Sequence, residues 1–83
     1  SDLDFRRLNA AQQEYYLELM EEVASMRGHE FVKLGFRGCA IEENRLIRLL
    51  EKMPQLRELD LCDCSGITVT TIARLLGHRC NAT

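Results

Sequence analysis

The sequence predicts an α/β fold, a right-handed solenoid of about three strand–turn–helix units with a short parallel sheet on its concave side. Three observations predict this fold. One pattern of apolar residues recurs along the whole chain, each copy alternates with the period of a strand, and the residues after each copy follow the period of a helix. Units of this kind stack in one direction, because no single unit can bury its own apolar face.

The repeated pattern reads apolar-x-apolar-x-x-apolar, and its copies are Leu3–Leu8, Leu34–Cys39 and Leu59–Cys64. Successive copies begin 31 residues (3 to 34) and 25 residues (34 to 59) apart. The chain therefore forms one repeat segment over residues 1–83, with units of approximately 1–29, 30–54 and 55–83. Since neither end carries the polar cap that a solenoid needs, we expect this segment to belong to a longer chain or to self-associate through its ends.

The first unit begins with Leu3 and Phe5, which alternate as a strand. Asn9 followed by Gln12 has the spacing of a capping box, so a helix is predicted to start there, and Gly28 is suited to close it. Five apolar residues are predicted to form the buried stripe of this helix: Tyr16, Leu19, Met20, Val23 and Met26.

The second unit predicts a helix whose apolar residues follow the spacing i, i+3, i+4, i+7: Leu46, Leu49, Leu50 and Met53. Pro54 is expected to end this helix. The third unit repeats the helical pattern with Val69, Ile72, Ala73 and Leu76. In that unit Thr68 is suited to the N-cap of the helix and Gly77 to its C-terminal end.

The four cysteines are Cys39, Cys62, Cys64 and Cys80. By themselves they leave three interpretations open, namely a disulfide framework, a zinc site, or reduced cysteines that act as small apolar side chains. The paired Cys-x2–4-Cys spacing typical of zinc is absent. In an extended strand Cys62 and Cys64 point to the same face, and neighbouring thiols of that kind rarely bond to each other.

The segment Leu56–Thr68 resembles the cysteine-containing subclass of leucine-rich repeats, whose pattern is Leu-x-x-Leu-x-Leu-x-x-Cys-x-x-Ile-Thr followed by a helix that ends near a second cysteine. Cys64 and Cys80 occupy the two cysteine positions, and Cys39 occupies the first one in the preceding unit. In the first unit Leu8 stands in place of the cysteine. The resemblance implies that Cys39 and Cys64 point inward without being oxidised.

The strand residues that alternate outward are expected to form the binding face of the solenoid. They are Asp4, Arg6, Lys33, Gly35, Arg37, Glu58, Asp60 and Cys62. In-register neighbouring strands would bring Lys33 beside Glu58, and Gly35 would leave the face locally flat. An exposed free thiol at Cys62 favours a reducing, intracellular compartment, either the cytoplasm or nucleus or the mitochondrial matrix.

The resemblance implies a non-catalytic protein–protein interaction module, such as the substrate-recruiting repeats of an F-box-type ubiquitin-ligase receptor. Nothing in the chain resembles the F-box itself. The alternative is a structural or assembly role, either self-association through uncapped ends or a repeat segment of a mitochondrial assembly factor or of an innate-immune receptor of the ribonuclease-inhibitor-like group. We expect protein partners, and a homo-oligomer through exposed repeat ends is the second possibility.

Composition and motifs argue against other classes of function. The net charge of −2 argues against general nucleic-acid binding, and no apolar run is long enough to cross a membrane. No Gly-rich phosphate loop occurs, and nothing positions a nucleophile, so neither an enzyme activity nor a cofactor or metal is expected. Residues 1–30 carry a net charge of −4 (three basic, seven acidic) and residues 31–57 one of +3 (six basic, three acidic). Such runs are typical of solvated faces.

Overall fold

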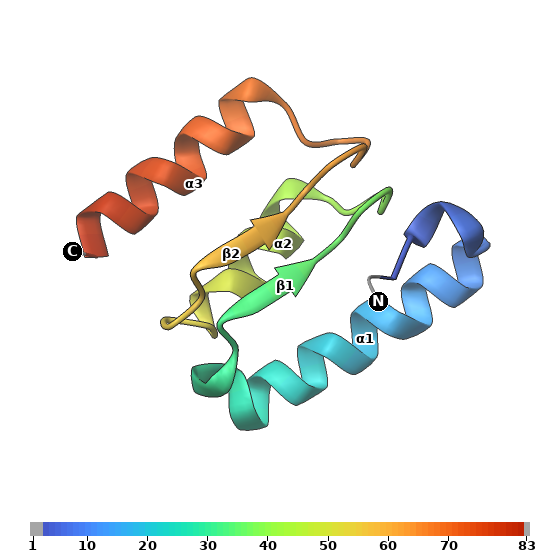
Figure 1. Ribbon diagram of the computed structural model, residues 1–83, viewed down its shortest axis with the longest axis horizontal. Helices are drawn as coiled ribbons and strands as arrows, with labels where there is room; N and C mark the ends of the chain where they lie inside the picture. Colours follow the sequence, from blue (N-terminus) through green and yellow to red (C-terminus); the bar gives the residue numbers. More distant parts are fainter. Residues whose placement is uncertain (1–2, 83) are drawn as a thin grey trace.

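The computed structural model describes residues 3–82, and side chains for residues 3–75 (Figure 1). It is a mixed α/β arrangement with a two-stranded parallel sheet. In chain order its elements are the 3-10 helix Phe5–Arg7, α1 (Ala10–Arg27), the 3-10 helix Gly28–Glu30, β1 (Lys33–Gly35), α2 (Glu43–Glu51), β2 (Glu58–Asp60) and α3 (Val69–Ala82). Figure 1 shows α2 behind the sheet, with α1 and α3 flanking it on opposite sides.

The two strands pair in the register predicted from the repeat. The Cα partners are Lys33 with Glu58, Leu34 with Leu59, and Gly35 with Asp60. The hydrogen bonds continue past the strands, because Phe36 N–H donates to Asp60 O and Gly38 N–H donates to Cys62 O, both at 2.8 Å. The outward-facing residues of both strands therefore lie side by side at the front of the sheet.

The turns at the ends of the three repeated patterns share one backbone hydrogen bond. It joins Leu8 N–H to Phe5 O (3.1 Å), Cys39 N–H to Phe36 O (2.8 Å) and Cys64 N–H to Leu61 O (3.3 Å). The second and third turns also share a left-handed residue, Gly38 with a φ of 74° and Asp63 with a φ of 58°. These two residues are 25 positions apart (38 to 63), so the repeat of the sequence is also a repeat of backbone geometry.

The predicted first strand is wrong, because Phe5–Arg7 form a 3-10 helix instead. The Asp4 carboxylate accepts a hydrogen bond from Arg6 N–H at 3.0 Å, and such local side-chain bonds draw the backbone away from a ladder. Phe5 nevertheless reaches the sheet. Its N–H donates to Arg37 O at 2.8 Å, and its fully buried ring lies 6.2 Å from that of Phe36.

Helix α1 begins as predicted but buries a different face. Asn9 and Gln12 form the capping box, each side chain accepting from the other residue's N–H. The residues buried against the core are Leu17 and Ala24, with Met20 partly buried beside them. The predicted buried stripe is therefore wrong apart from Met20. Its other members are exposed or half-buried: Tyr16, Leu19, Val23 and Met26.

Helix α2 confirms the predicted buried face. All four predicted residues are buried, but the helix ends at Glu51, three residues before Pro54, so Met53 lies just beyond it. Together with Leu34 of β1 and with residues that follow the two strands, these side chains form the core of the molecule, which contains Leu34, Phe36, Cys39, Ile41, Leu46, Leu49, Leu50, Met53 and Cys64. The second unit is thus covered by the first unit on one side and by the third unit on the other.

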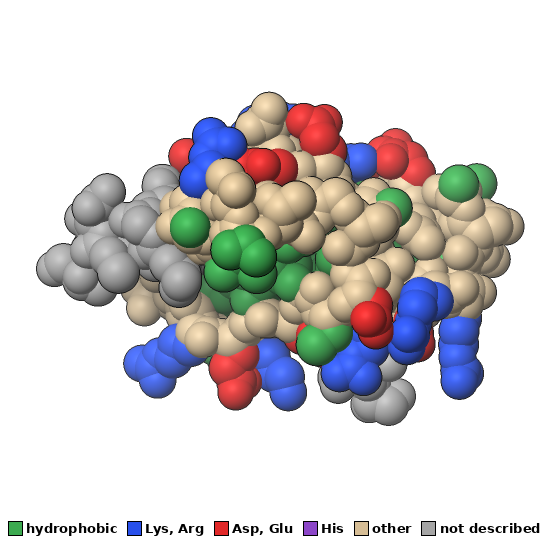
Figure 2. Space-filling view, turned by 90° about the horizontal axis from the view of Figure 1, so that it is seen from above, with side chains coloured by type: hydrophobic (Ala, Val, Ile, Leu, Met, Phe, Trp, Pro, Cys, Tyr) green, Lys and Arg blue, Asp and Glu red, His purple; other side chains and the backbone are tan. Residues whose placement is uncertain are grey.

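Helix α3 is capped as predicted, with Thr71 N–H donating to the Thr68 hydroxyl at 3.2 Å, but it continues through Gly77, so the predicted end there is wrong. Of its predicted stripe, Val69, Ile72 and Ala73 are exposed, and Leu76 lies outside the described side chains. Leu46 is 0% exposed, whereas Ile72 at the same repeat position is 45% exposed. Figure 2 looks at the molecule from the α3 side, where hydrophobic side chains gather in the middle of the face.

Ion pairs join the three helices to one another. The Arg45 guanidinium of α2 binds both carboxylates of α1 that face it, Glu21 at 2.7 Å and Glu14 at 2.8 Å. On its other side α2 presents Glu43 to α3, where the carboxylate accepts from the Thr71 hydroxyl at 3.1 Å and pairs with Arg74. The opposite net charges of residues 1–30 and 31–57 are therefore partly explained by contacts between neighbouring units.

No helix in the described part of the chain combines the length and the apolar character required for a membrane span.

Candidate binding surface

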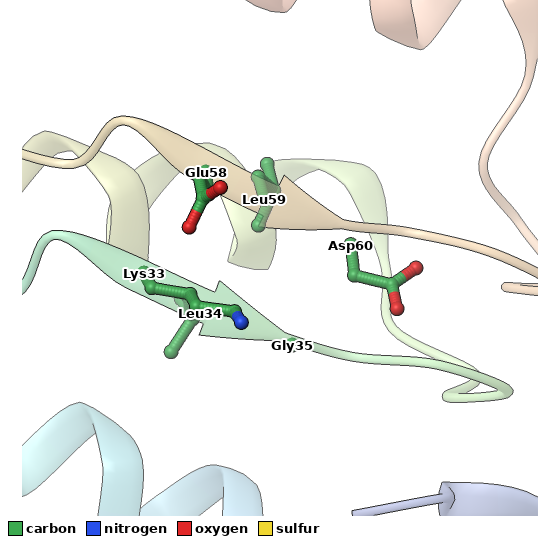
Figure 3. A pocket seen from close by; sticks show the side chains of 6 residues that line it. All are labelled: Lys33, Leu34, Gly35, Glu58, Leu59 and Asp60. Atoms are coloured by element: carbon green, nitrogen blue, oxygen red, sulfur yellow. The ribbon is translucent and has the colours of Figure 1, made fainter. Parts of the chain in front are cut away.

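Four of the predicted face residues surround one open hollow on the sheet. Lys33, Gly35, Glu58 and Asp60 line it, above the strand residues Leu34 and Leu59, and its volume is about 460 Å³. Figure 3 shows the charged side chains arising from the two adjacent strands, with Gly35 contributing none. The strand register is responsible for this arrangement, because it brings Lys33 opposite Glu58 and Gly35 opposite Asp60.

Gly35 keeps the hollow open. A Cβ atom at this position would meet nothing within 4 Å, so a larger side chain would occupy the hollow without clashing with the chain itself. Gly35 lies in ordinary strand geometry, since the glycines with a positive φ are Gly38 and Gly66. The absence of a side chain here leaves backbone accessible to another molecule.

One edge of the hollow is fixed by an ion pair. The Arg37 guanidinium contacts the Asp60 carboxylate at 3.2 Å, and the other Asp60 oxygen accepts from Cys62 N–H at 2.9 Å. The hydrogen bonds from Cys62, first from its backbone and then from its side chain, lower the pKa of Asp60, and the charge of Arg37 lowers it further. Asp60 is therefore a fixed anion, whereas Lys33 and Glu58 make no ion pair with any described residue.

The remaining predicted residues form a second group at the carboxyl end of the strands. Arg6 pairs with Asp4 at 2.9 Å and with Asp63 at 3.1 Å. The hydrogen bond from the Arg6 side chain lowers the pKa of Asp4 to about 2. The first unit thus reaches the face through a charge contact with the third unit, although it forms no strand.

Asp63 is the residue of this group that the sequence prediction missed. Its repeat equivalent is Gly38, over which the Arg6 side chain lies so closely that a Cβ on Gly38 would come within 2.3 Å of Arg6 Cγ. Asp and Asn tolerate the left-handed conformation better than most residues, so an aspartate aligned with a turn glycine was the available signal.

The cysteines lie where the repeat predicted, as far as the structure describes them. Cys39 and Cys64 are buried free thiols and Cys62 is an exposed one, whereas Cys80 lies outside the described side chains. Burial raises the pKa of Cys39 to about 11, and burial also raises the pKa of Cys64. A hydrogen bond with Asp60 raises the pKa of Cys62. All three therefore favour the protonated thiol, which is a poor nucleophile and a poor metal ligand.

Among the residues that the structure describes, no three His, Cys, Asp or Glu side chains come together in a way that could hold a metal ion. The arrangement offers charges of both signs beside accessible backbone, which suits recognition of another polypeptide.

The chain was compared with family models, with curated proteins and with solved structures, and none of the three comparisons found a match.

Proposed function

We propose that this chain is a non-catalytic protein–protein interaction module of the leucine-rich-repeat type, which binds a partner protein across the front of its sheet. The observation that carries the proposal is the open hollow between Lys33 and Glu58, two exposed charges of opposite sign that no contact within the described chain neutralises. Charged side chains at the rim of a contact determine which partner is accepted and how fast it associates.

The chemistry of the hollow suggests the kind of partner segment. An extended segment that crosses both strands can place an acidic side chain at Lys33 and a basic one at Glu58. Its backbone can approach the sheet at Gly35, where no side chain intervenes. The ion pair of Arg37 and Asp60 lies at one edge of the path and needs no rearrangement.

The sequence resemblance of Leu56–Thr68 supports a more specific proposal, namely the substrate-recruiting repeats of an F-box-type ubiquitin-ligase receptor. The free thiol exposed at Cys62 favours a reducing, intracellular compartment for such a module. The partner in this case is a protein to be ubiquitinated, and the strand face is the part of the receptor that selects it.

A second candidate is a structural or assembly role. The exposure of apolar side chains on α3 favours this role. Ile72 is exposed although Leu46, at the same repeat position, is buried, and Val69 is 84% exposed. Side chains of this kind are normally covered, so another polypeptide packed beside α3 would stabilise the third unit. This role uses the ends of the molecule rather than the strand face.

The two candidates are separated by charge reversals at matched positions. The variants Lys33→Glu and Glu58→Lys change the strand face, and the controls Arg48→Glu and Glu51→Lys make the same changes on the exposed surface of α2. Proteins captured by each variant are quantified by mass spectrometry. The proposal predicts a specific set lost with both face variants, by about tenfold or more, and kept with both controls. Equal capture by all four variants would contradict it.

A further inference from the structure

Helix α1 carries a second apolar face that the described residues leave partly exposed. Tyr16, Leu19, Val23 and Met26 follow the spacing i, i+3, i+7, i+10, which is the spacing of a seam between two packed helices. Met26 is 65% exposed, Leu19 42% and Tyr16 39%, whereas Val23 is half-buried. Glu14 and Glu21, which contact α2, lie on a different face of the helix. The seam therefore lies outside the contact with α2, and at Val23 it borders Phe31.

The same seam contains a hollow near its C-terminal end. The hollow has a volume of about 260 Å³ and is lined by Val23, Arg27, Glu30 and Phe31. Its apolar side chains are Val23 and the partly buried Phe31, and its rim is the ion pair in which Arg27 contacts Glu30 at 2.9 Å. A cavity of about 150 Å³ holds a benzene ring, so this hollow is large enough for an aromatic side chain.

We propose that a second copy of this chain docks antiparallel along the outer face of α1, with Tyr16 of each copy seated in the hollow of the other. Tyr16 lies seven to eleven residues before Val23 and Arg27, or about 10–16 Å along the helix axis. A two-fold axis midway between them, which passes through the seam between Leu19 and Val23, brings each tyrosine opposite the hollow of its partner. Closed two-fold dimers are built from such self-complementary patches.

The charges at the hollow also suit this occupant. The Arg27 guanidinium at the rim is attracted to the electron-rich face of an aromatic ring, and the tyrosine hydroxyl can reach the polar rim while its ring contacts Val23 and Phe31. In a parallel pair Tyr16 would instead face Tyr16, and both hollows would stay empty. The hollow therefore determines the direction of the pair.

Sedimentation equilibrium over a wide concentration range tests the proposal. The native chain is expected to show a concentration-dependent dimer. Tyr16→Glu and Val23→Arg should each sediment as monomers with unchanged circular dichroism. The matched control Val69→Glu introduces the same charge on the exposed face of α3, and this variant should still dimerise. The proposal does not depend on the strand-face function, which the variants Lys33→Glu and Glu58→Lys test separately.

Mixing the two disrupting variants tests the direction of the pair. In the antiparallel arrangement Tyr16→Glu and Val23→Arg restore a dimer when mixed, because one contact is native and the other joins the new carboxylate to the new guanidinium. Three results would overturn the proposal. They are a native monomer at every concentration, a dimer lost in Val69→Glu but kept in Tyr16→Glu, and a mixture of the two variants that stays monomeric.

Discussion

Cys64 donates a hydrogen bond from its thiol to the carbonyl oxygen of Phe36, 2.9 Å away, and so ties the turn of the third unit to the strand end of the second. The bond is buried, and the thiol stays protonated because burial raises the pKa of Cys64. A cysteine at this repeat position therefore acts as a small side chain with one donor, which a disulfide or a metal bond would remove.

Replacing Cys64 by alanine should destabilise the chain. Cys64→Ala removes one of the two donors to the Phe36 carbonyl, which keeps its bond from Cys39 N–H, and creates a small cavity, so the free energy of unfolding should fall by about 1–2 kcal/mol. Urea denaturation measures this free energy of unfolding. The control Cys62→Ala alters an exposed thiol and should change the value by less than about 0.5 kcal/mol. Equal losses in both variants would show that the buried bond contributes nothing.

The thiols should react with iodoacetamide in a definite order. Cys62 is exposed and should be modified first, whereas Cys39 and Cys64 should react only after unfolding, because they are buried and burial raises their pKa values. Mass spectrometry of peptides follows the reaction, in a Cys80→Ser background so that three thiols remain. Modification of Cys39 in the folded chain as fast as Cys62 would contradict the packing of the turns.

The Arg45 contacts with α1 should make stability sensitive to acid. The hydrogen bond from Arg45 lowers the folded-state pKa of Glu21 below its ordinary value of 4.5. The unfolded chain then binds the proton more readily, so this contribution is present above about pH 4.5 and is lost as the pH falls through the folded pKa.

Thermal melts at neutral and at acid pH of the native chain and of Arg45→Met test this. At neutral pH the variant should be less stable by about 1 kcal/mol, and its stability should fall less on acidification than that of the native chain. The control Arg48→Met removes an exposed guanidinium from the same helix. If the native chain and Arg45→Met lose equal stability in acid, the contact between α1 and α2 is not the origin of the effect.

Phe5 should hold the first unit in place. Its ring is fully buried against Phe36, so Phe5→Ala should lower the free energy of unfolding by about 3 kcal/mol or more. Leu3→Ala, two residues earlier and 40% exposed, is the control and should cost well below 1 kcal/mol. A mild effect of Phe5→Ala would mean that residues 3–9 do not cover the end of the core.

The predictions from sequence succeeded where both sides of an element are covered. The α2 stripe was predicted correctly because its neighbours bury Leu46, Leu49 and Leu50. Helix α1 carries two apolar faces, one through Leu17 and Ala24 and one through Tyr16 and Leu19, and periodicity alone does not tell which of them faces the core. The contacts with α2 decide this, and they depend on Arg45, which lies 24 residues beyond Glu21.

A competing local hydrogen bond explains why the first strand was predicted wrongly. Leu3 and Phe5 alternate like a strand, but the Asp4 carboxylate between them binds the Arg6 backbone and starts a 3-10 helix. Of the candidate face, the strand register and the position of Gly35 followed from the repeat. The contact of Arg6 with Asp63 could not be predicted, because it joins the first unit to the third through a turn whose side-chain direction the sequence does not record.

We propose that a partner protein binds across the front of the two strands. Hydrogen exchange of the chain, measured with and without a partner obtained by capture, tests this binding mode. Binding is expected to slow exchange in residues 33–38 and 58–63 and to leave residues 43–51 of α2 unchanged. Protection confined to α1, α2 or α3, with the strand segments exchanging as in the free chain, would contradict it.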